Sequence, residues 1–219
     1  MDKSAALADL SRQIESCEKC ALHFSRKKSV PGEGPNQVTV MCIGEGPGFY
    51  ENEQGRPFVG QAGKLLDDLL AKGGLKREEV FITNVVKCRP PGNRDPMPEE
   101  LAACNVYLDA QIKLLSPLVI VTLGRYSMTK FMPNAKISNV HGQAVWIDDK
   151  LVVAMYHPAA ALHQRSILPQ IESDFVKLPD FISMAMADVR NHKKVEEKSK
   201  DLSGPEESEK HEPTQLSLF

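Results

Sequence analysis

The sequence predicts an α/β fold in which a four-stranded parallel sheet lies between two layers of helices. Four short apolar runs have the length and the β-branched content of buried strands, and they lie at 38–44, 80–83, 118–124 and 151–156. Amphipathic segments separate them, and such alternation is typical of parallel sheets covered on both faces. A chain of 219 residues is long enough for one domain of this three-layer α/β/α kind with a tail.

The helices are predicted from apolar side chains that recur three and four positions apart. The segment 62–72 carries four leucines on one face and follows the first strand. Further helices are expected between later strands, at 98–115 and 125–131, and at the two ends of the domain, at 7–17 and 169–189. The segment 137–146 precedes the fourth strand, and we expect it to add a hairpin.

The charges mark a boundary near residue 190. The segment 191–219 holds seven of the 29 acidic and five of the 27 basic residues, which leaves 22 of each in 1–190. Apolar side chains almost vanish over 191–214, which predicts a disordered, charged linker. The last five residues, 215–219, are largely apolar again. We therefore expect a domain at 1–190, a linker at 191–214 and a docking peptide at 215–219.

The composition excludes several classes of protein. A formal net charge of -2 is unlike that of a histone-like basic protein, and it argues against bulk electrostatic binding to DNA or acidic membranes. No apolar run approaches the roughly 20 residues of a membrane span, and the first residues lack the apolar stretch of a signal peptide. We therefore expect a cytoplasmic protein without a membrane partner, whose cysteines are not paired in disulfides.

Polar side chains follow three of the predicted strands, at the edge where ligands bind in such sheets. Glu45 and Glu51 lie in a glycine-rich loop after the first strand, Asn84 follows the second, and His157 follows the fourth. His157 precedes a proline, which favours an extended backbone there. Each residue taken alone is more often structural, as a turn former or a solvated charge. Together at one edge they become candidates for a site.

Four cysteines form the strongest single pattern. Cys17 and Cys20 have metal-ligand spacing, and Cys88 and Cys104 follow on either side of a proline-rich loop. Four thiolates from three places suit either a zinc ion or a [4Fe–4S] cluster. Cys42 lies within an apolar strand, so we expect a buried, inert thiol there.

Several motifs together resemble the family 4 uracil-DNA glycosylases, the iron–sulfur type of bacteria and archaea. They are Gly-Glu-Gly-Pro-Gly at 44–48, Gly-Arg-Pro-Phe-Val-Gly at 55–60, Thr-Asn at 83–84, Lys-Cys-Arg-Pro-Pro-x-Asn-Arg at 87–94 and His-Pro-Ala-Ala at 157–160. The resemblance covers about residues 8–187 and is specific only as a set. It implies a DNA repair hydrolase that flips uracil out of DNA and leaves an abasic site. It also implies that Cys17, Cys20, Cys88 and Cys104 hold a structural [4Fe–4S] cluster.

The resemblance also implies a role for each site residue. Phe58 stacks on the flipped base, and Asn84 reads its Watson–Crick edge. Glu51 fills the space where thymine carries its methyl group, His157 donates to uracil O2, and Glu45 orients the attacking water. The close backbone of Gly46 and Gly48, together with Asn93, completes the substrate-binding set. The arginines Arg89, Arg94, Arg125 and Arg165 are expected along the phosphate path, and Ala161 or Leu162 is expected to enter the vacated base site.

Two departures from the family pattern bear on the chemistry. The first motif of the family usually ends Glu-Asp, whereas this chain has Glu51-Asn52, so the rate or its pH dependence is expected to differ. A relative that traps uracil covalently carries a basic insert with a nucleophilic histidine. No Arg-Arg-x-His run lies between Lys87 and Cys104, so turnover is expected.

The chain ends in Gln-Leu-Ser-Leu-Phe, which resembles the peptide by which repair enzymes bind a sliding clamp. Leu216, Leu218 and Phe219 would be apolar anchors and Gln215 a hydrogen-bonding handle. We therefore expect uracil-containing DNA and a sliding clamp as partners of a monomeric enzyme associated with the nucleoid. Two alternatives remain open: a non-catalytic iron–sulfur module that binds DNA or senses redox state, and a zinc-containing relative. The presence of Glu45, Asn84 and His157 together disfavours a mere binding module.

Overall fold

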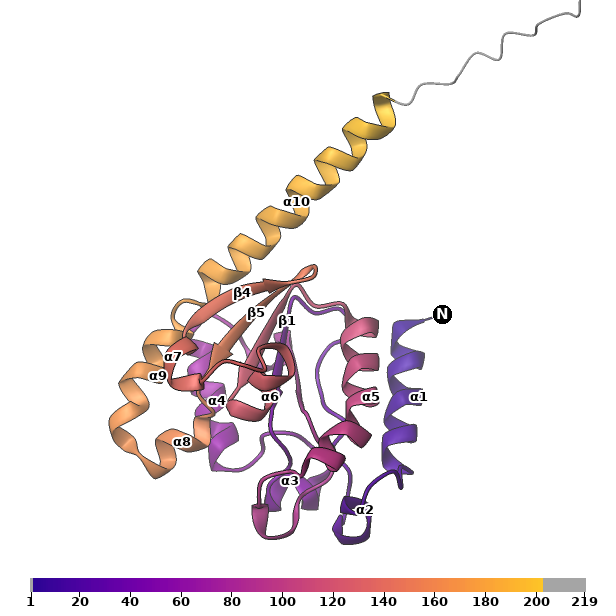
Figure 1. Cartoon of the computed structure of the whole chain (residues 1–219), viewed down its shortest axis with the longest axis vertical. Helices are drawn as coiled ribbons and strands as arrows, with labels where there is room; N and C mark the ends of the chain where they lie inside the picture. The colour runs from indigo at the N-terminus through magenta and orange to yellow at the C-terminus, as the bar shows by residue number, and fades with distance from the viewer. Residues whose placement is uncertain (1, 203–219) are drawn as a thin grey trace, which may run out of the picture. The chain divides into compact units, whose positions relative to one another are not determined.

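A five-stranded sheet forms the centre of the molecule in the computed structural model, which describes residues 2–202, with side chains through Arg190. The order of its strands is β2-β1-β3-β5-β4 (Figure 1). Four strands are parallel: β1 (Val40–Gly44), β2 (Val80–Asn84), β3 (Val119–Leu123) and β5 (Lys150–Met155). The fifth, β4 (Gln143–Ile147), runs antiparallel to β5 at the edge of the sheet.

The prediction of a four-stranded, all-parallel sheet is therefore wrong in one respect. The segment 137–146 does not form the hairpin expected within it: residues 137–140 are helical, and β4 forms a hairpin with β5 through Asp148 and Asp149, where Asp148 has a positive φ of 52°. Most side chains of β4 are exposed or half-buried, so its sequence does not contain the buried apolar run that marks the other four strands.

Alternate strand residues pack on opposite faces of the sheet, which gives the molecule its three layers. Val40 and Cys42 point into one apolar core with α4 (Gln61–Lys72), α8 (Pro158–His163) and α9 (Leu168–Phe175). Met41 and Ile43 point into a second core with α5 (Pro98–Leu115). Figure 1 shows α4, α8 and α9 on one side of the sheet, and α5 with α1 (Lys3–Glu15) on the other.

The remaining elements are short. They are α2 (Leu22–Ser25), α3 (Phe49–Gln54), α6 (Arg125–Phe131) and α7 (Ile137–Val140), with 3-10 turns at Arg77–Glu79, Pro91–Asn93 and Arg165–Ile167. The helices predicted at 98–115 and 125–131 are confirmed at both ends.

The helix predicted at 169–189 is two helices rather than one. The first, α9, ends at Phe175, and α10 (Leu178–Leu202) begins after two intervening residues. Pro179 explains the break, because proline fits the first turn of a helix but not the interior of a continuing one. Its position inside the predicted helix was the sequence signal for this boundary.

The chain divides into two units. The first, Met1–Ala185, contains the sheet and every site described below, and the second begins at Met186. The helix α10 is assigned through Leu202, past residue 190, where the sequence predicts the linker to begin. The predicted docking peptide at 215–219 lies outside the described residues. Among the described residues, no helix is long and apolar enough to cross a membrane.

The topology brings several loops to one edge of the sheet. The carboxyl ends of β1, β2, β3 and β5 lie at this edge because the four strands are parallel. Chain order reverses on either side of β1, since β2 pairs on one flank and β3 on the other. A ligand site is expected outside the strand ends at such a switch point.

Candidate active site

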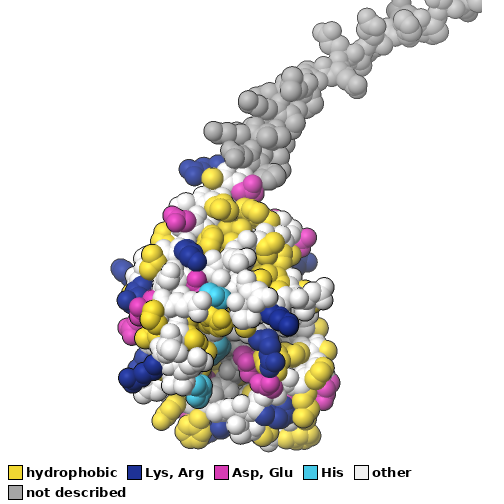
Figure 2. Space-filling model, turned by 60° about the vertical axis from the view of Figure 1, so that its left-hand side comes forward, with side chains coloured by type: hydrophobic (Ala, Val, Ile, Leu, Met, Phe, Trp, Pro, Cys, Tyr) yellow, Lys and Arg dark blue, Asp and Glu magenta, His cyan; other side chains and the backbone are white. Residues whose placement is uncertain are grey.

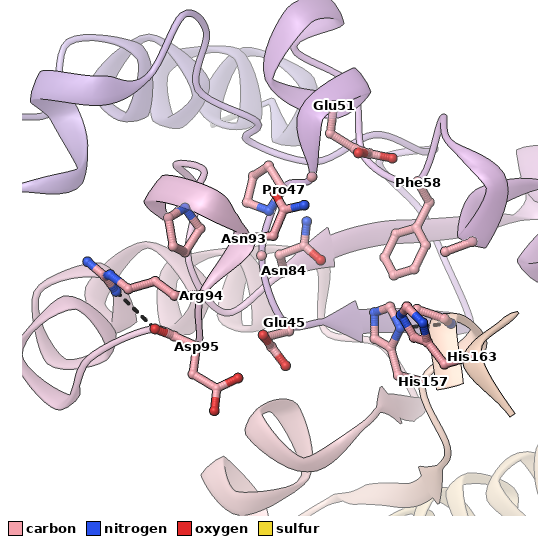
Figure 3. Close-up of a pocket in the computed structure, with 15 residues that line it drawn as sticks. Glu45, Pro47, Glu51, Phe58, Asn84, Asn93, Arg94, Asp95, His157 and His163 are labelled. Atoms are coloured by element: carbon pink, nitrogen blue, oxygen red, sulfur yellow. Dashed lines mark hydrogen bonds between the residues drawn. The ribbon is translucent and has the colours of Figure 1, made fainter. Parts of the chain in front are cut away.

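A cavity of about 550 Å³ opens at the carboxyl ends of these strands (Figure 3). Its volume lies in the range of small-molecule sites. All three predicted catalytic residues and all five predicted substrate-binding residues line it: Glu45, Glu51, His157, Gly46, Gly48, Phe58, Asn84 and Asn93. Glu45 and His157 are 112 positions apart in the sequence, and the fold brings both into this one pocket.

Asn84 is the last residue of β2 and presents an unpaired acceptor. Its Oδ1 is buried and has no hydrogen-bond partner among the described residues, although buried polar atoms are rarely left unpaired. A side chain at Gly44 would collide with this oxygen and, at 2.6 Å, with the ring of Phe58. Glycine at the end of β1 thus lets both side chains approach the strand end.

A buried polar network holds the backbone of Asn84 from behind. The ammonium of Lys87 donates to the carbonyl oxygen of Asn84 over 2.9 Å and to Thr83 Oγ1 and Gln111 Oε1 over 2.6 Å each. Gln111 in turn donates to the carbonyl of Pro31 over 2.7 Å. Burial lowers the pKa of Lys87 to about 7. The network leaves the Asn84 side chain free to face the pocket.

Phe58 forms one wall and is held in an uncommon conformation. Its φ is 51°, in the left-handed region that non-glycine residues rarely occupy. Its ring stacks on His157 with centroids 5.6 Å apart and planes 26° from parallel. Arg77 donates to its carbonyl oxygen over 3.1 Å and to that of Pro57 over 2.6 Å. A Cβ at Gly63 would overlap the same Phe58 carbonyl, so that position also requires glycine.

The carboxylate of Glu51 is fixed by backbone groups. Its Oε1 accepts hydrogen bonds from the N–H groups of Val59, over 2.8 Å, and Gly60, over 2.9 Å. These donors lie just before α4, where a helix start favours negative charge. The neighbouring Asn52 is buried, and its Oδ1 accepts from the Lys27 N–H over 2.9 Å. Asn52, the residue at which the chain departs from the family pattern, does not line the pocket.

His157 is the residue that caps α8. It has the extended backbone predicted for a residue before proline, and its Nδ1 accepts the Ala159 N–H over 3.1 Å. Burial lowers the pKa of His157 to about 4, partly opposed by the charge of Glu51. The ring is therefore neutral near pH 7, and with Nδ1 acting as acceptor its proton lies on Nε2.

Glu45 lies directly after β1, opposite the loop that contains Asp95. Burial raises the pKa of Glu45, the charge of Asp95 raises it further, and Arg125 opposes both. Arg125 donates to Asp95 Oδ2 over 2.9 Å. A partly buried carboxylate with a raised pKa is a candidate base or water-orienting group.

The arginines predicted along the DNA path occupy different places. Arg94 lines the pocket and forms two hydrogen bonds, of 2.9 and 2.6 Å, with Glu100. Arg125 pairs with Asp95, Arg89 donates to Asn93 Oδ1 over 2.8 Å, and Arg165 is exposed. On the face shown in Figure 2, basic and acidic side chains are interspersed rather than gathered in one basic patch. On this face positive charge is therefore local, which agrees with the neutral overall charge of residues 1–190.

The two candidates for entering the vacated base site differ in exposure. Ala161 is buried in the core below α8, so it is not free to enter a DNA helix. Leu162 is exposed on the same helix. The prediction for Ala161 is therefore wrong, and Leu162 remains the candidate.

Six lining residues were not predicted to be site residues, although three of them lie within the recognised motifs: Pro47, Pro90 and Ala159 in the motifs, and Ala62, Asp95 and His163 outside them. Four of them are small or apolar and carry no chemical signal. Asp95 directly follows the Arg94 of a recognised motif, which could have drawn attention to it. His163 lines the same pocket as His157, but the sequence gives no reason to connect the two.

The four predicted ligand cysteines line one smaller cavity between the end of α1 and α5. All are free thiols, and Cys88 and Cys104 are buried. Burial raises the pKa of Cys104 to about 11. Hydrogen bonds reach three of the sulfurs, from Arg26 Nη1 to Cys88 (3.4 Å), from Lys87 N to Cys104 (3.2 Å) and from Lys19 N to Cys17 (3.5 Å).

The geometry of this cysteine site differs from that of a site for one ion. Among the described residues, no group of three or more His, Cys, Asp or Glu side chains is arranged to hold a single metal ion. Cys42 lies apart from the other four, fully buried in the sheet as expected, and burial raises the pKa of its thiol to about 12.

Comparisons with known proteins agree with this geometry. The uracil DNA glycosylase superfamily matches residues 31–187. A type-4 uracil-DNA glycosylase of Archaeoglobus fulgidus is 45% identical over 183 residues, which are 79% of this chain and 92% of that protein. Proteins of the same name from Sulfurisphaera tokodaii (45% identical, over 79% of this chain and 83% of the relative) and Thermotoga maritima (46%, over 72% and 83%) are equally similar.

Proposed function

The chain belongs to the uracil-DNA glycosylase superfamily, and we propose that it removes uracil from DNA by hydrolysing the N-glycosidic bond, leaving an abasic site. The observation that carries this proposal is the buried Oδ1 of Asn84, which has no hydrogen-bond partner within the described part of the chain and lies in a pocket of about 550 Å³. Such an acceptor is satisfied by a ligand that brings its own N–H group. Uracil offers N3–H beside the acceptor O4, which matches both halves of a carboxamide.

The base must leave the duplex to reach this pocket, at a cost of a few kcal/mol. The ring of Phe58 supplies a stacking surface for the flipped base. Asn84 then donates from its amide NH₂ to uracil O4 and accepts from N3–H. Cytosine reverses both polarities, so it would leave buried groups unpaired and bind far more weakly.

Glu51 and His157 complete the recognition of the base. With both backbone bonds in place, the Glu51 carboxylate is a rigid wall beside uracil C5, where the methyl group of thymine would clash. The proton on His157 Nε2 donates to uracil O2 as the glycosidic bond breaks. A neutral donor aimed at the oxygen where negative charge develops stabilises the leaving group through preorganised electrostatics.

Glu45 acts on the sugar side of the bond. Its carboxylate orients the attacking water and stabilises the positive charge that develops on the sugar. Gly46 and Gly48 keep this wall thin, because a side chain at Gly46 would meet Val86 at 2.8 Å and one at Gly48 would meet Glu51 at 2.8 Å. Asn93 is fixed at the opposite rim by Arg89.

The four cysteines, we propose, hold a [4Fe–4S] cluster rather than zinc. They line one cavity, and three of their sulfurs accept hydrogen bonds. Four thiolates are the usual ligand set of a [4Fe–4S] cluster, and hydrogen bonds to the sulfurs are among the features that tune such clusters. When bound, the cluster supplies a structural link between the end of α1, the start of the proline-rich loop and α5. The redox chemistry of iron is not needed for hydrolysis.

Two further proposals concern delivery to DNA. The peptide at 215–219 would dock on a sliding clamp, and the preceding segment would tether the enzyme near DNA at raised effective concentration. A monomer working at the nucleoid is consistent with a DNA substrate. Both peptide and tether extend beyond the described residues, so their role rests on the sequence.

A gel assay tests the proposed function. A labelled oligonucleotide with one uracil is incubated with the protein and then treated with alkali, beside matched oligonucleotides with cytosine or thymine at that position. We expect strand scission only for uracil and only after alkali, because a monofunctional glycosylase leaves the abasic strand intact. Uracil strands that survive alkali would overturn the proposal.

A further inference from the structure

Phe49 is an exposed aromatic residue at the rim of the uracil pocket. It is the first residue of α3 and directly follows Gly48, which lines the pocket. Its side chain remains 52% exposed, although large aromatic side chains usually bury most of their surface. The pocket-lining roles described above do not use it.

A guanidinium from a second loop lies over this ring. The Cζ atom of Arg89 is 5.3 Å from the ring centroid, within the range of a cation–π contact. Arg89 directly precedes Pro90, another lining residue, and its Nε is fixed by Asn93 Oδ1 at 2.8 Å. The ring of Tyr50 lies almost perpendicular to that of Phe49, with centroids 5.5 Å apart and planes at 84°.

Phe49 and Arg89 together form what we call the rim shelf. Both are next in sequence to residues of the pocket wall, and they join the loops after β1 and β2. The neighbouring nucleotides are joined to the flipped deoxyuridine through the sugar–phosphate backbone. They must therefore pass close to this rim. Aromatic rings and guanidinium planes both stack on unpaired bases, and Arg89 adds a charge complementary to phosphate.

We propose that the rim shelf stacks on an unpaired base next to the flipped uracil and so forms a subsite for single-stranded DNA. This inference rests on the proposed uracil excision. An exposed aromatic ring alone could equally suit an apolar protein surface. The overlying cation and the position beside the base pocket favour a nucleic-acid base.

The test measures binding of single-stranded oligonucleotides that carry a non-hydrolysable 2′-fluorinated deoxyuridine, by fluorescence anisotropy. One oligonucleotide has ordinary bases beside the deoxyuridine, and two others have an abasic residue on one side or the other. We expect wild type to lose affinity on the order of 10-fold when one particular flanking base is removed. F49A should bind the intact strand weaker by a similar factor and lose nothing more when that base is absent.

Two variants control for indirect effects. F49W restores a stacking surface and should recover the wild-type pattern. W146A removes another exposed aromatic side chain, which pairs with the start of β5, at the opposite end of that strand from His157, and should bind like wild type. The proposal would be wrong if F49A bound the intact strand with wild-type affinity. It would also be wrong if F49A bound the intact strand and the strand lacking the flanking base more weakly than wild type by the same factor. Excision of uracil by wild type in the gel assay keeps that failure separate from failure of the proposed function.

Discussion

The guanidinium of Arg77 donates a 3.1 Å hydrogen bond to the carbonyl oxygen of Phe58, whose ring forms one wall of the pocket. Arg77 also pairs with Glu33 and Asp67 at 3.0 and 2.9 Å, so its position is fixed from two sides. The left-handed backbone of Phe58 is therefore maintained by a residue that does not line the pocket. Such strain persists only where surrounding structure enforces it.

Replacing Arg77 should loosen the stacking wall. R77M removes a donor from the carbonyl oxygens of Pro57 and Phe58 and from Asp67, while Glu33 keeps its pair with Arg56, and the loss should cost about 1–3 kcal/mol of unfolding free energy. We expect uracil excision to fall more than stability explains, through a raised KM. Urea unfolding and steady-state kinetics measure the two effects.

Arg56 offers a matched control for this variant. It pairs with the same Glu33, at 2.6 Å, but it is largely exposed and bonds to no residue of the pocket. R56M should keep the wild-type KM. Equal KM values for R77M and wild type would show that Phe58 does not need Arg77.

The raised pKa of Glu45 predicts the acid limb of the pH–rate profile. A group with a raised pKa takes up its proton at a higher pH than an exposed glutamate, so the rate should begin to fall earlier on acidification. The charges that face it are Asp95 and Arg125. His157, with its pKa lowered to about 4, stays neutral through this range and adds no limb of its own between pH 5 and about 8.

Single-turnover excision across pH, with wild type and E45Q, checks this assignment. E45Q should be slower by about 10²–10⁴-fold at neutral pH and should lack the limb. D95N should move the midpoint of the limb to lower pH, because a neighbouring negative charge is removed. An unchanged limb in E45Q would assign it to another group.

Loss of one cysteine ligand should release the link between α1 and α5. We expect C104S to lose iron, sulfide and visible cluster absorbance, and to melt about 5 °C lower or more. C42A serves as the control, because Cys42 is buried in the sheet and does not line the cavity of the four other cysteines. This variant should retain its full iron content. Stoichiometric zinc and no iron in anaerobically purified wild type would contradict the proposed cluster.

Deleting residues 215–219 should abolish binding to a sliding clamp in calorimetry. Excision from short oligonucleotides should stay at the wild-type rate, because the deleted residues lie outside the catalytic unit. S217A keeps the predicted anchors and serves as the control. Undiminished clamp binding by the truncated chain would refute the docking peptide.

Much of this architecture could be predicted because buried parallel strands carry a strong apolar signal. Val119–Leu123 is such a strand, whereas β4 was not predicted as a fifth strand of the sheet, because its exposed and half-buried side chains give no such run. The pocket residues were found through motifs, since Glu45 and His157 meet only in the folded chain. Asn52 shows the limit of that approach: it departs from the family pattern beside Glu51, yet its side chain points to Lys27. The same holds for Arg77, whose hydrogen bonds to the chain around Phe58 carry no sequence signature.

The most direct test of this account is the single-turnover excision rate of N84D on strands that carry uracil or cytosine. Aspartate keeps the size of Asn84 but replaces the donor toward uracil O4 with a second oxygen. We predict that wild type excises only uracil, and that N84D loses uracil excision by about 100-fold or more while its melting temperature is unchanged. Uracil excision by N84D at the wild-type rate would contradict the claim that this pocket reads the base through Asn84.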